Sequence, residues 1–346
     1  MRSLRKSSKN VRNKVEDYYA VQRVSASSLG WFKVSPKYYR MRFDQEIEEE
    51  SKAYFDLGKQ IHMAILEPIR FKKEIIHLEY ETPVNPKQKE FCKLVAQNKK
   101  RLSVGEKAEQ AYKQVYETKR KTAERVKKDA NALYRKFRKY VKYLKQSKKY
   151  KVVLPTSTWE LIQNIVETVK QHKLANNLLF ENDYGVFDGG NLLVNNELPI
   201  YWDFNLDEET TIPCKSLLDR LIIDHKNKTI KLIDLKTAYS LKDFDVHFLE
   251  FGYHRQLAFY WLAVAWMFQN DFPEADFWEY QKYTYIIALQ TRGINECKVY
   301  TITDKSLNEG LEEILQITRE LYWHVENDLW DYTRAYYEGD GAEKLE

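Results

Sequence analysis

Two aspartates and a lysine on a short apolar segment are the residues of this sequence whose types and spacing could do chemistry. Residues 215–237 (KSLLDRLIIDHKNKTIKLIDLKT) have the pattern of a β-hairpin with two buried strands. If the turn is centred between Lys226 and Asn227, Asp219 faces Asp234 across the strands. Carboxylates in such a pair lie about 4.5 to 5.5 Å apart, where like charges destabilise a sheet. The pair therefore requires a cation.

Lys236 could supply part of that positive charge. It lies two positions after Asp234, so the alternation of a strand puts both side chains on one face. An ammonium there could also stabilise the negative charge that develops during hydrolysis, and carboxylates at this spacing are ligands that Mg²⁺ or Mn²⁺ prefers. A surface hairpin with ordinary ion pairs has the same short pattern, so this motif alone does not decide between the two interpretations.

Length and composition limit the class of protein. A chain of 346 residues with 43% hydrophobic residues can form one large or two average domains with a packed core. It contains no run of 18 apolar residues, and no apolar segment follows the basic N-terminus, so we expect a soluble cytoplasmic protein without a membrane span. Three widely spaced cysteines exclude a four-cysteine iron–sulfur cluster within one chain.

The basic residues are concentrated in one segment. Residues 87–151 contain 23 Lys and Arg against 6 Asp and Glu, a balance of +17, so the rest of the chain carries −12 of the total +5. The segment has few Gly and Pro and is rich in helix-forming residues, which predicts two or three long helices. A solvated helical face would show the same composition, but the interleaving of Tyr and Phe with the charges favours contact with a nucleic acid.

Two further helices could bring polar groups to the hairpin. Residues 51–68 have apolar residues at the spacing of one helical face, and His62 lies near the end of this segment as either a structural group or a ligand. Residues 252–269 form an apolar helix in which Gln256 and Tyr260, four positions apart, share a face. These two polar side chains need hydrogen-bond partners.

The remaining segments predict a mixed α/β arrangement. Strand-like runs at 184–188 and 191–204 precede the hairpin, and Glu197 in the second run either points to the face of the hairpin acids or is exposed. Another strand is expected at 284–290, and a helix at 306–337.

Four separated motifs together resemble one family: SASSL with SPKYYR, GKQIHMAILEP, LLDRLI with LIDLKT, and GYHRQLAFYW. In their order and spacing they resemble the RecE / exonuclease VIII branch of the PD-(D/E)XK nucleases, in the group related to the RecB nuclease domain. This resemblance implies an α/β fold with a restriction-endonuclease-like core, in which helices flank a mixed central sheet. It also implies a single nuclease domain, residues 18–337. Composition predicts a basic flexible arm at residues 1–17 and a disordered tail at 338–346, and the Lys-rich helical insertion at 87–151 departs from the family because it is larger than the corresponding region.

The resemblance also implies roles for individual residues. The implied metal ligands are His62, Asp219, Asp234, the backbone carbonyl of Leu235 and, with less support, Glu197. Lys236 would be the catalytic lysine, and Gln256 and Tyr260 match a QxxxY motif expected near the lysine and the DNA backbone. The sequence departs from the family at Leu218, where a proline usually precedes the first aspartate.

The activity implied by the resemblance is Mg²⁺- or Mn²⁺-dependent exonuclease digestion of linear duplex DNA from its 5′ ends, in recombination or repair of the phage type. Expected partners are double-stranded DNA ends, a single-strand annealing protein and further copies of the chain in a ring. The alternatives are another PD-(D/E)XK nuclease, structure-specific or defence-associated, and a catalytically inactive DNA-binding protein.

Overall fold

The computed structural model describes residues 18–47, 53–147, 150, 152–181 and 191–342. The predicted basic arm 1–17 and the predicted strand at 184–188 lie outside these ranges, as does the end of the tail. The chain divides into two compact units, residues 1–62 with 165–346 and residues 63–164. We call them the sheet unit and the helical unit. Within the described ranges, none of the helices combines the length and the apolar character needed to cross a membrane.

The sheet unit is built on a five-stranded mixed sheet in the order β3-β4-β5-β6-β7. Only β5 and β6 run parallel, and the other neighbours are antiparallel. The strand bounds are Leu192–Asn205 (β3), Thr211–Asp224 (β4), Thr229–Ala238 (β5), Gln281–Gln290 (β6) and Cys297–Thr301 (β7). β4 and β5 form the predicted hairpin, and its register follows the predicted turn, with Asp224 opposite Thr229.

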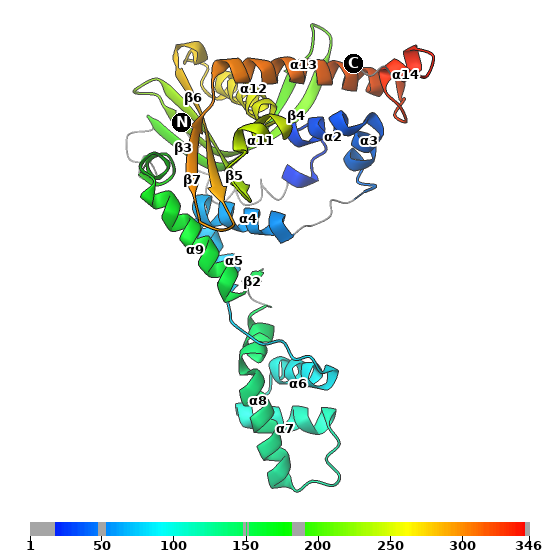
Figure 1. The fold of residues 1–346 in the computed structure, drawn as a ribbon, viewed down its shortest axis with the longest axis vertical. Coiled ribbons are helices and arrows are strands. Elements are labelled where there is room, and N and C mark those ends of the chain that lie inside the picture. Colours follow the sequence, from blue (N-terminus) through cyan, green and yellow to red (C-terminus); the bar gives the residue numbers. More distant parts are fainter. Residues whose placement is uncertain (1–17, 48–52, 148–149, 151, 182–190, 343–346) are drawn as a thin grey trace. The chain divides into compact units, whose positions relative to one another are not determined.

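The hydrophobic core of the sheet unit lies between this sheet and the helices that cover it (Figure 1). α12 (Tyr253–Asp271) contacts β3 and β4, while α2 (Ala26–Val34) and α13 (Asp304–Asn327) pack against α12. Trp202, Phe259 and Phe268 are buried there. Gly252 precedes α12 with φ +66, a left-handed conformation that glycine adopts without steric cost.

Side-chain caps fix the ends of the shorter helices. Ser25 forms a capping box with Ser28 at the start of α2, and Ser35 caps α3 (Pro36–Phe43), whose first residue is a proline. The helix predicted at 306–337 is interrupted: α13 ends before Asp328, which has φ 49, and a short α14 (Arg334–Glu338) follows. Two other helices of the described chain are α4 (Ala53–Leu66) and α11 (Phe244–Glu250), which contacts α12.

The helical unit contains three helices around a separate core. They are α6 (Pro86–Gln97), α7 (Val104–Val115) and α8 (Ala123–Gln146), and they pack around Phe91, Val95, Ala130 and Phe137. α7 begins at an N-terminal cap, where Ser103 and Glu106 form a capping box. The unit also includes α5 (Pro68–Glu74) and the parallel pair β1 (Ile75–His77) and β2 (Val152–Leu154).

Three helical segments connect the helical unit back to the sheet. α9 (Thr156–Gln171) crosses the boundary between the two units, and α10 (Lys173–Asn176) and a short π-helix (Asn177–Glu181) follow it.

Candidate metal and nuclease centre

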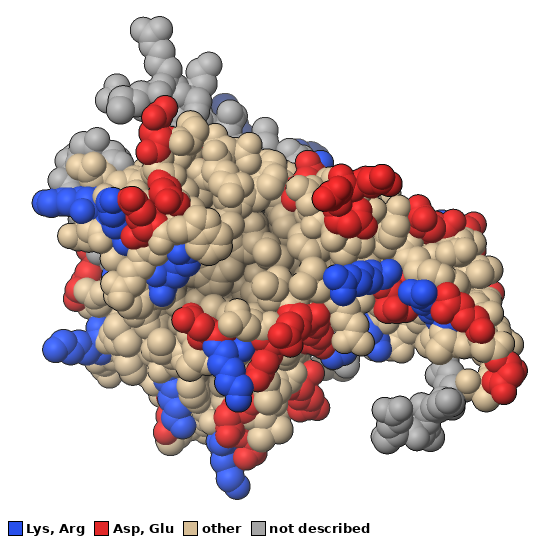
Figure 2. All heavy atoms as spheres, turned by 90° about the horizontal axis from the view of Figure 1, so that it is seen from above, with Lys and Arg blue, Asp and Glu red and all other residues tan. Residues whose placement is uncertain are grey.

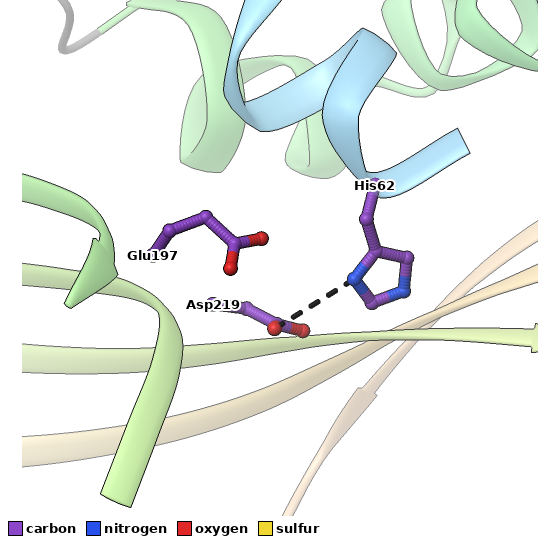
Figure 3. Close-up of side chains that lie close together, drawn as sticks. All are labelled: His62, Glu197 and Asp219. Atoms are coloured by element: carbon purple, nitrogen blue, oxygen red, sulfur yellow. Dashed lines mark ion pairs between the residues drawn. The ribbon is translucent and has the colours of Figure 1, made fainter. Parts of the chain in front are cut away.

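A histidine and two carboxylates from three different elements meet beside the sheet. His62 projects from α4 toward Asp219 of β4, and Glu197 of β3 points to the same place (Figure 3). The His62 Nδ1 and Asp219 Oδ1 atoms are 3.7 Å apart. Ligand atoms of the three side chains all lie within 4.8 Å of one another, so this group could hold a metal ion.

The position of Glu197 results from an interruption of the β3–β4 ladder. Asn196 pairs with Arg220 and Leu198 pairs with Leu218, but the regular pairing skips the intervening residues Glu197 and Asp219. Glu197 has φ 48, a left-handed conformation that costs a non-glycine residue about 1 to 3 kcal/mol. The irregular backbone leaves the two carboxylates as neighbours across the strands.

On its other side, Asp219 faces the strand that carries Asp234. The regular β4–β5 rungs run from Asp224 to Arg220, which pairs with Ile233, so the next position along the same register places Asp219 opposite Asp234. There the Asp219 carboxylate accepts a hydrogen bond of 2.7 Å from the backbone N–H of Leu235. The carbonyl of Leu235 was predicted to bind a metal. The hydrogen bond seen at this residue is the one from its N–H to Asp219, which is itself a predicted metal ligand. Asp219 on β4 therefore has one acid on each neighbouring strand, Glu197 on β3 and Asp234 on β5.

Lys236 and Asp234 form an ion pair with a distance of 2.6 Å between Nζ and Oδ2. The Asp234 side chain is 3% exposed and that of Lys236 is 16% exposed. Burial raises the pKa of Asp234 to about 6, because Lys236 only partly offsets the loss of hydration and the charge of Asp219 adds to it. Burial also opposes the charge of Lys236, but Asp234 and Asp219 outweigh this and raise the pKa of the ammonium.

The His62 and Asp219 pair stabilises the charged form of both groups. Burial opposes protonation of His62, yet the Asp219 and Glu197 carboxylates outweigh it and raise the pKa of the imidazole. Burial would likewise raise the pKa of Asp219, but His62, Lys236 and the Leu235 N–H together lower it. The two aspartates of the hairpin therefore have pKa values displaced in opposite directions, a pattern that is concentrated at functional sites.

Gln256 and Tyr260 lie on one face of α12, as predicted from their spacing. The Gln256 side-chain amide donates a hydrogen bond of 2.7 Å to the Tyr260 hydroxyl. Burial, with the charges of Asp234 and Asp219, raises the pKa of Tyr260 well above its ordinary value. The hydroxyl is therefore neutral at physiological pH and remains a hydrogen-bond donor.

Tyr253 is a residue of this centre that sequence reasoning missed. The Lys236 Nζ atom lies 4.8 Å from the centroid of the Tyr253 ring, within the range of a cation–π interaction. Tyr253 precedes Gln256 by three positions and Tyr260 by seven, which puts it on the same helical face. That periodicity is the signal in the sequence that could have identified it.

The residues present fit a divalent cation. One imidazole nitrogen and carboxylate oxygens are ligands suited to Mn²⁺, and carboxylates to Mg²⁺. The Asp234 carboxylate is buried beside this group, and its Oδ2 atom pairs with the Lys236 ammonium.

Comparison with known proteins gives little independent information on this centre. No family model matches the sequence, and no curated protein matches it. Among solved structures, a candidate exonuclease from Eubacterium rectale aligns with 100% of this chain and 94% of its own, at 11% identity and a TM-score of 0.46. The protein SSO0001 aligns with 78% of this chain and 84% of its own, at 12% identity and a TM-score of 0.27.

Proposed function

We propose that this protein is a metal-dependent deoxyribonuclease with a PD-(D/E)XK-type active site, which acts as an exonuclease on linear duplex DNA. The observation that carries the proposal is the placement of Glu197, Asp219 and Asp234 on three adjacent strands, with His62 and Lys236 directly beside them. This arrangement accounts for the order of the sequence motifs that resemble the RecE / exonuclease VIII branch.

The chain's own residues divide into two groups in this reaction. His62, Glu197 and Asp219 would hold one divalent cation, and Asp234 would lie next to these three ligands. When bound, the cation would polarise the scissile phosphate and activate the attacking water. Lys236 places a positive charge where negative charge accumulates on the phosphate oxygens. Asp234 and the Tyr253 ring fix the position of that ammonium.

The neutral Tyr260 hydroxyl and Gln256 would position the DNA backbone near Lys236, as the resemblance implies. The 5′-to-3′ polarity, the single-strand annealing partner and the ring assembly belong to the same proposal and rest on the resemblance alone.

The test is digestion of end-labelled linear duplex DNA in Mg²⁺ or Mn²⁺ by the full chain. Substituting Asp219→Asn or Lys236→Met should lower the rate by about 10²- to 10³-fold, the decrease typical for removal of one charge-stabilising group. Asp203→Asn is the matched control, because this acid lies on β3, the neighbour of the strand of Asp219, but is half-exposed in a surface ion pair with Arg23. Parent-like digestion by both site variants would refute the proposal.

The choice of substrate separates the alternative activities. An exonuclease releases mononucleotides or short products from linear DNA and leaves covalently closed circles intact. Cleavage of closed circles would identify an endonuclease with the same centre. DNA binding without release of any nucleotide in either metal would identify a non-catalytic DNA-binding protein.

A further inference from the structure

The charge of the helical unit is concentrated on its longest helix. α8 contains nine Lys and Arg in its 24 residues, against the two acids Glu124 and Asp129. By contrast, acidic and basic side chains are interspersed on the face of the molecule drawn in Figure 2. Like charges one turn apart destabilise a helix, and α8 carries a net charge of +7. Solubility of the unit alone does not explain a charge of this size on one helix.

The basic residues lie on the side of α8 that faces away from the core. Val126, Ala130, Phe137 and Val141 are buried against α6 and α7. At about 100° per residue, the opposite side carries an exposed series with the spacing of seven residues, namely Lys128, Arg135 and Lys142. Arg138, Lys139 and Lys145 are also exposed and extend the series toward the C-terminal end of the helix.

The acids near α8 neutralise other basic residues. Asp129 pairs with Lys121 and Arg125, and Glu79 pairs with Lys139. Within the described part of the chain, Lys128, Arg135 and Lys142 form no ion pair with any of these acids. Their charges can therefore interact with an external partner.

A hollow with an excess of basic residues lies beside the same series. Its volume is about 430 Å³, and its lining comprises four basic residues, two acids and two tyrosines: Arg135, Lys136, Arg138, Lys139, Glu79, Glu81, Tyr80 and Tyr140. The bases exceed the acids by two. The Tyr80 ring stacks on Tyr143 with centroids 4.2 Å apart, which holds this side of the hollow against α8.

The surface of α8 matches a polyanion better than a protein partner. Protein interfaces are depleted of lysine at their centre and depend on large apolar or aromatic anchors. None of the large hydrophobic side chains of α8 is exposed. We propose that the exposed basic face of α8 binds the phosphate backbone of duplex DNA without sequence preference. α8 has a kink at Phe137, and its length along the chain is about 36 Å, from 24 residues at about 1.5 Å each, which is close to one turn of the duplex.

This proposal goes beyond the hydrolytic centre, because it concerns affinity in the absence of a metal. The experiment measures binding of the full chain to a labelled duplex of about 30 base pairs and arbitrary sequence by fluorescence anisotropy in EDTA, between about 50 and 300 mM salt. The test variant carries Lys128→Gln, Arg135→Gln and Lys142→Gln together. The control variant removes the same charge from exposed lysines of the sheet unit, with Lys173→Gln, Lys226→Gln and Lys305→Gln.

The test variant should bind at least about 10-fold more weakly than the parent at about 100 mM salt. The slope of log K against log salt should fall by about 0.9 for each phosphate that is no longer neutralised, or by about 2.7 for three. The control should retain most of the parent slope. If the two variants show the same affinity and slope, the proposal is wrong. Weaker binding by the test variant supports it even if the parent releases no nucleotide, an outcome that would refute only the proposed nuclease activity.

All six substituted side chains are exposed, so both variants should fold. A thermal transition for each variant within a few degrees of the parent confirms this.

Discussion

The two aspartates of the hairpin should respond in opposite directions when stability is measured against pH. Burial raises the pKa of Asp234 to about 6, so the folded protein favours its protonated form relative to the unfolded chain. The stability that this preference provides is complete below the ordinary pKa of 3.8 and is lost as the pH rises through about 6. Above that pH, the ionised carboxylate destabilises the metal-free fold by about 3 kcal/mol.

Substituting Asp234→Asn removes this titration. The attraction between Lys236 and the ionised carboxylate is already part of the pKa of about 6, so it adds no separate contribution to the pH dependence. The variant should therefore gain stability relative to the parent as the pH rises. The free energy of unfolding of the variant minus that of the parent should be about 2 kcal/mol larger at about pH 7.5 than at about pH 4.5. Urea unfolding in EDTA, followed by tryptophan fluorescence at both pH values, measures this difference directly.

Asp219→Asn is the matched control, because the pKa of Asp219 is lowered. Its stabilising contribution is present above the ordinary pKa of 3.8 and is lost as the pH falls through the lowered value. At about pH 4.5 and 7.5, both above 3.8, this contribution is present in full, so the destabilisation caused by this variant should be nearly equal at the two pH values. If the change in the free energy of unfolding depended on pH equally for the two variants, the opposite pKa shifts of Asp219 and Asp234 would be wrong.

Three further predictions concern the supports of the centre. Glu197→Gly should raise the free energy of unfolding by about 1 kcal/mol in EDTA, because glycine relieves the positive φ, and should weaken Mn²⁺ binding in calorimetry. Glu313→Gln should cost about 2 to 3 kcal/mol near neutral pH in urea unfolding, because Glu313 forms ion pairs with Lys33, His254 and Arg255. The exposed pair of Glu309 with Lys305 provides the control substitution Glu309→Gln, with an expected change below about 0.5 kcal/mol. Gly310→Ala should lower the thermal midpoint, since its Cβ would lie 2.6 Å from the backbone oxygen of His254, and overpacking of this kind costs about 1 to 3 kcal/mol.

The hairpin was predictable because its signals are local. The polar turn at residues 225–228 separates two runs of Leu and Ile, and the register follows by counting from the turn. The structure confirms that register from Asp224 to Arg220. The pairing of Gln256 with Tyr260 was predictable for the same reason, since four positions in a helix fix a shared face.

The role of Glu197 was not decidable from the sequence. Its carboxylate reaches the site because the β3–β4 ladder is interrupted at that residue and its φ is positive, and glutamate carries no propensity for that conformation. The break at Asp328 after α13 has the same cause, a left-handed residue within a helical pattern that is continuous in the sequence. The boundary between the two units was hidden as well, because it falls inside α4, between His62 and Met63, where no linker composition marks it.

The charges of the acids and of Lys236 determine how much positive charge a bound cation would have to supply at this centre. Glu197, Asp219 and Asp234 carry three negative charges when ionised, and Lys236 offsets one of them. The remaining charge of −2 balances one divalent cation when His62 is neutral. Without the cation, burial together with Asp219 raises the pKa of Asp234, and the Asp219 and Glu197 carboxylates raise that of His62 against its burial, so both groups take up protons more readily. A cation must displace these protons, so its affinity should increase with pH until both groups are deprotonated.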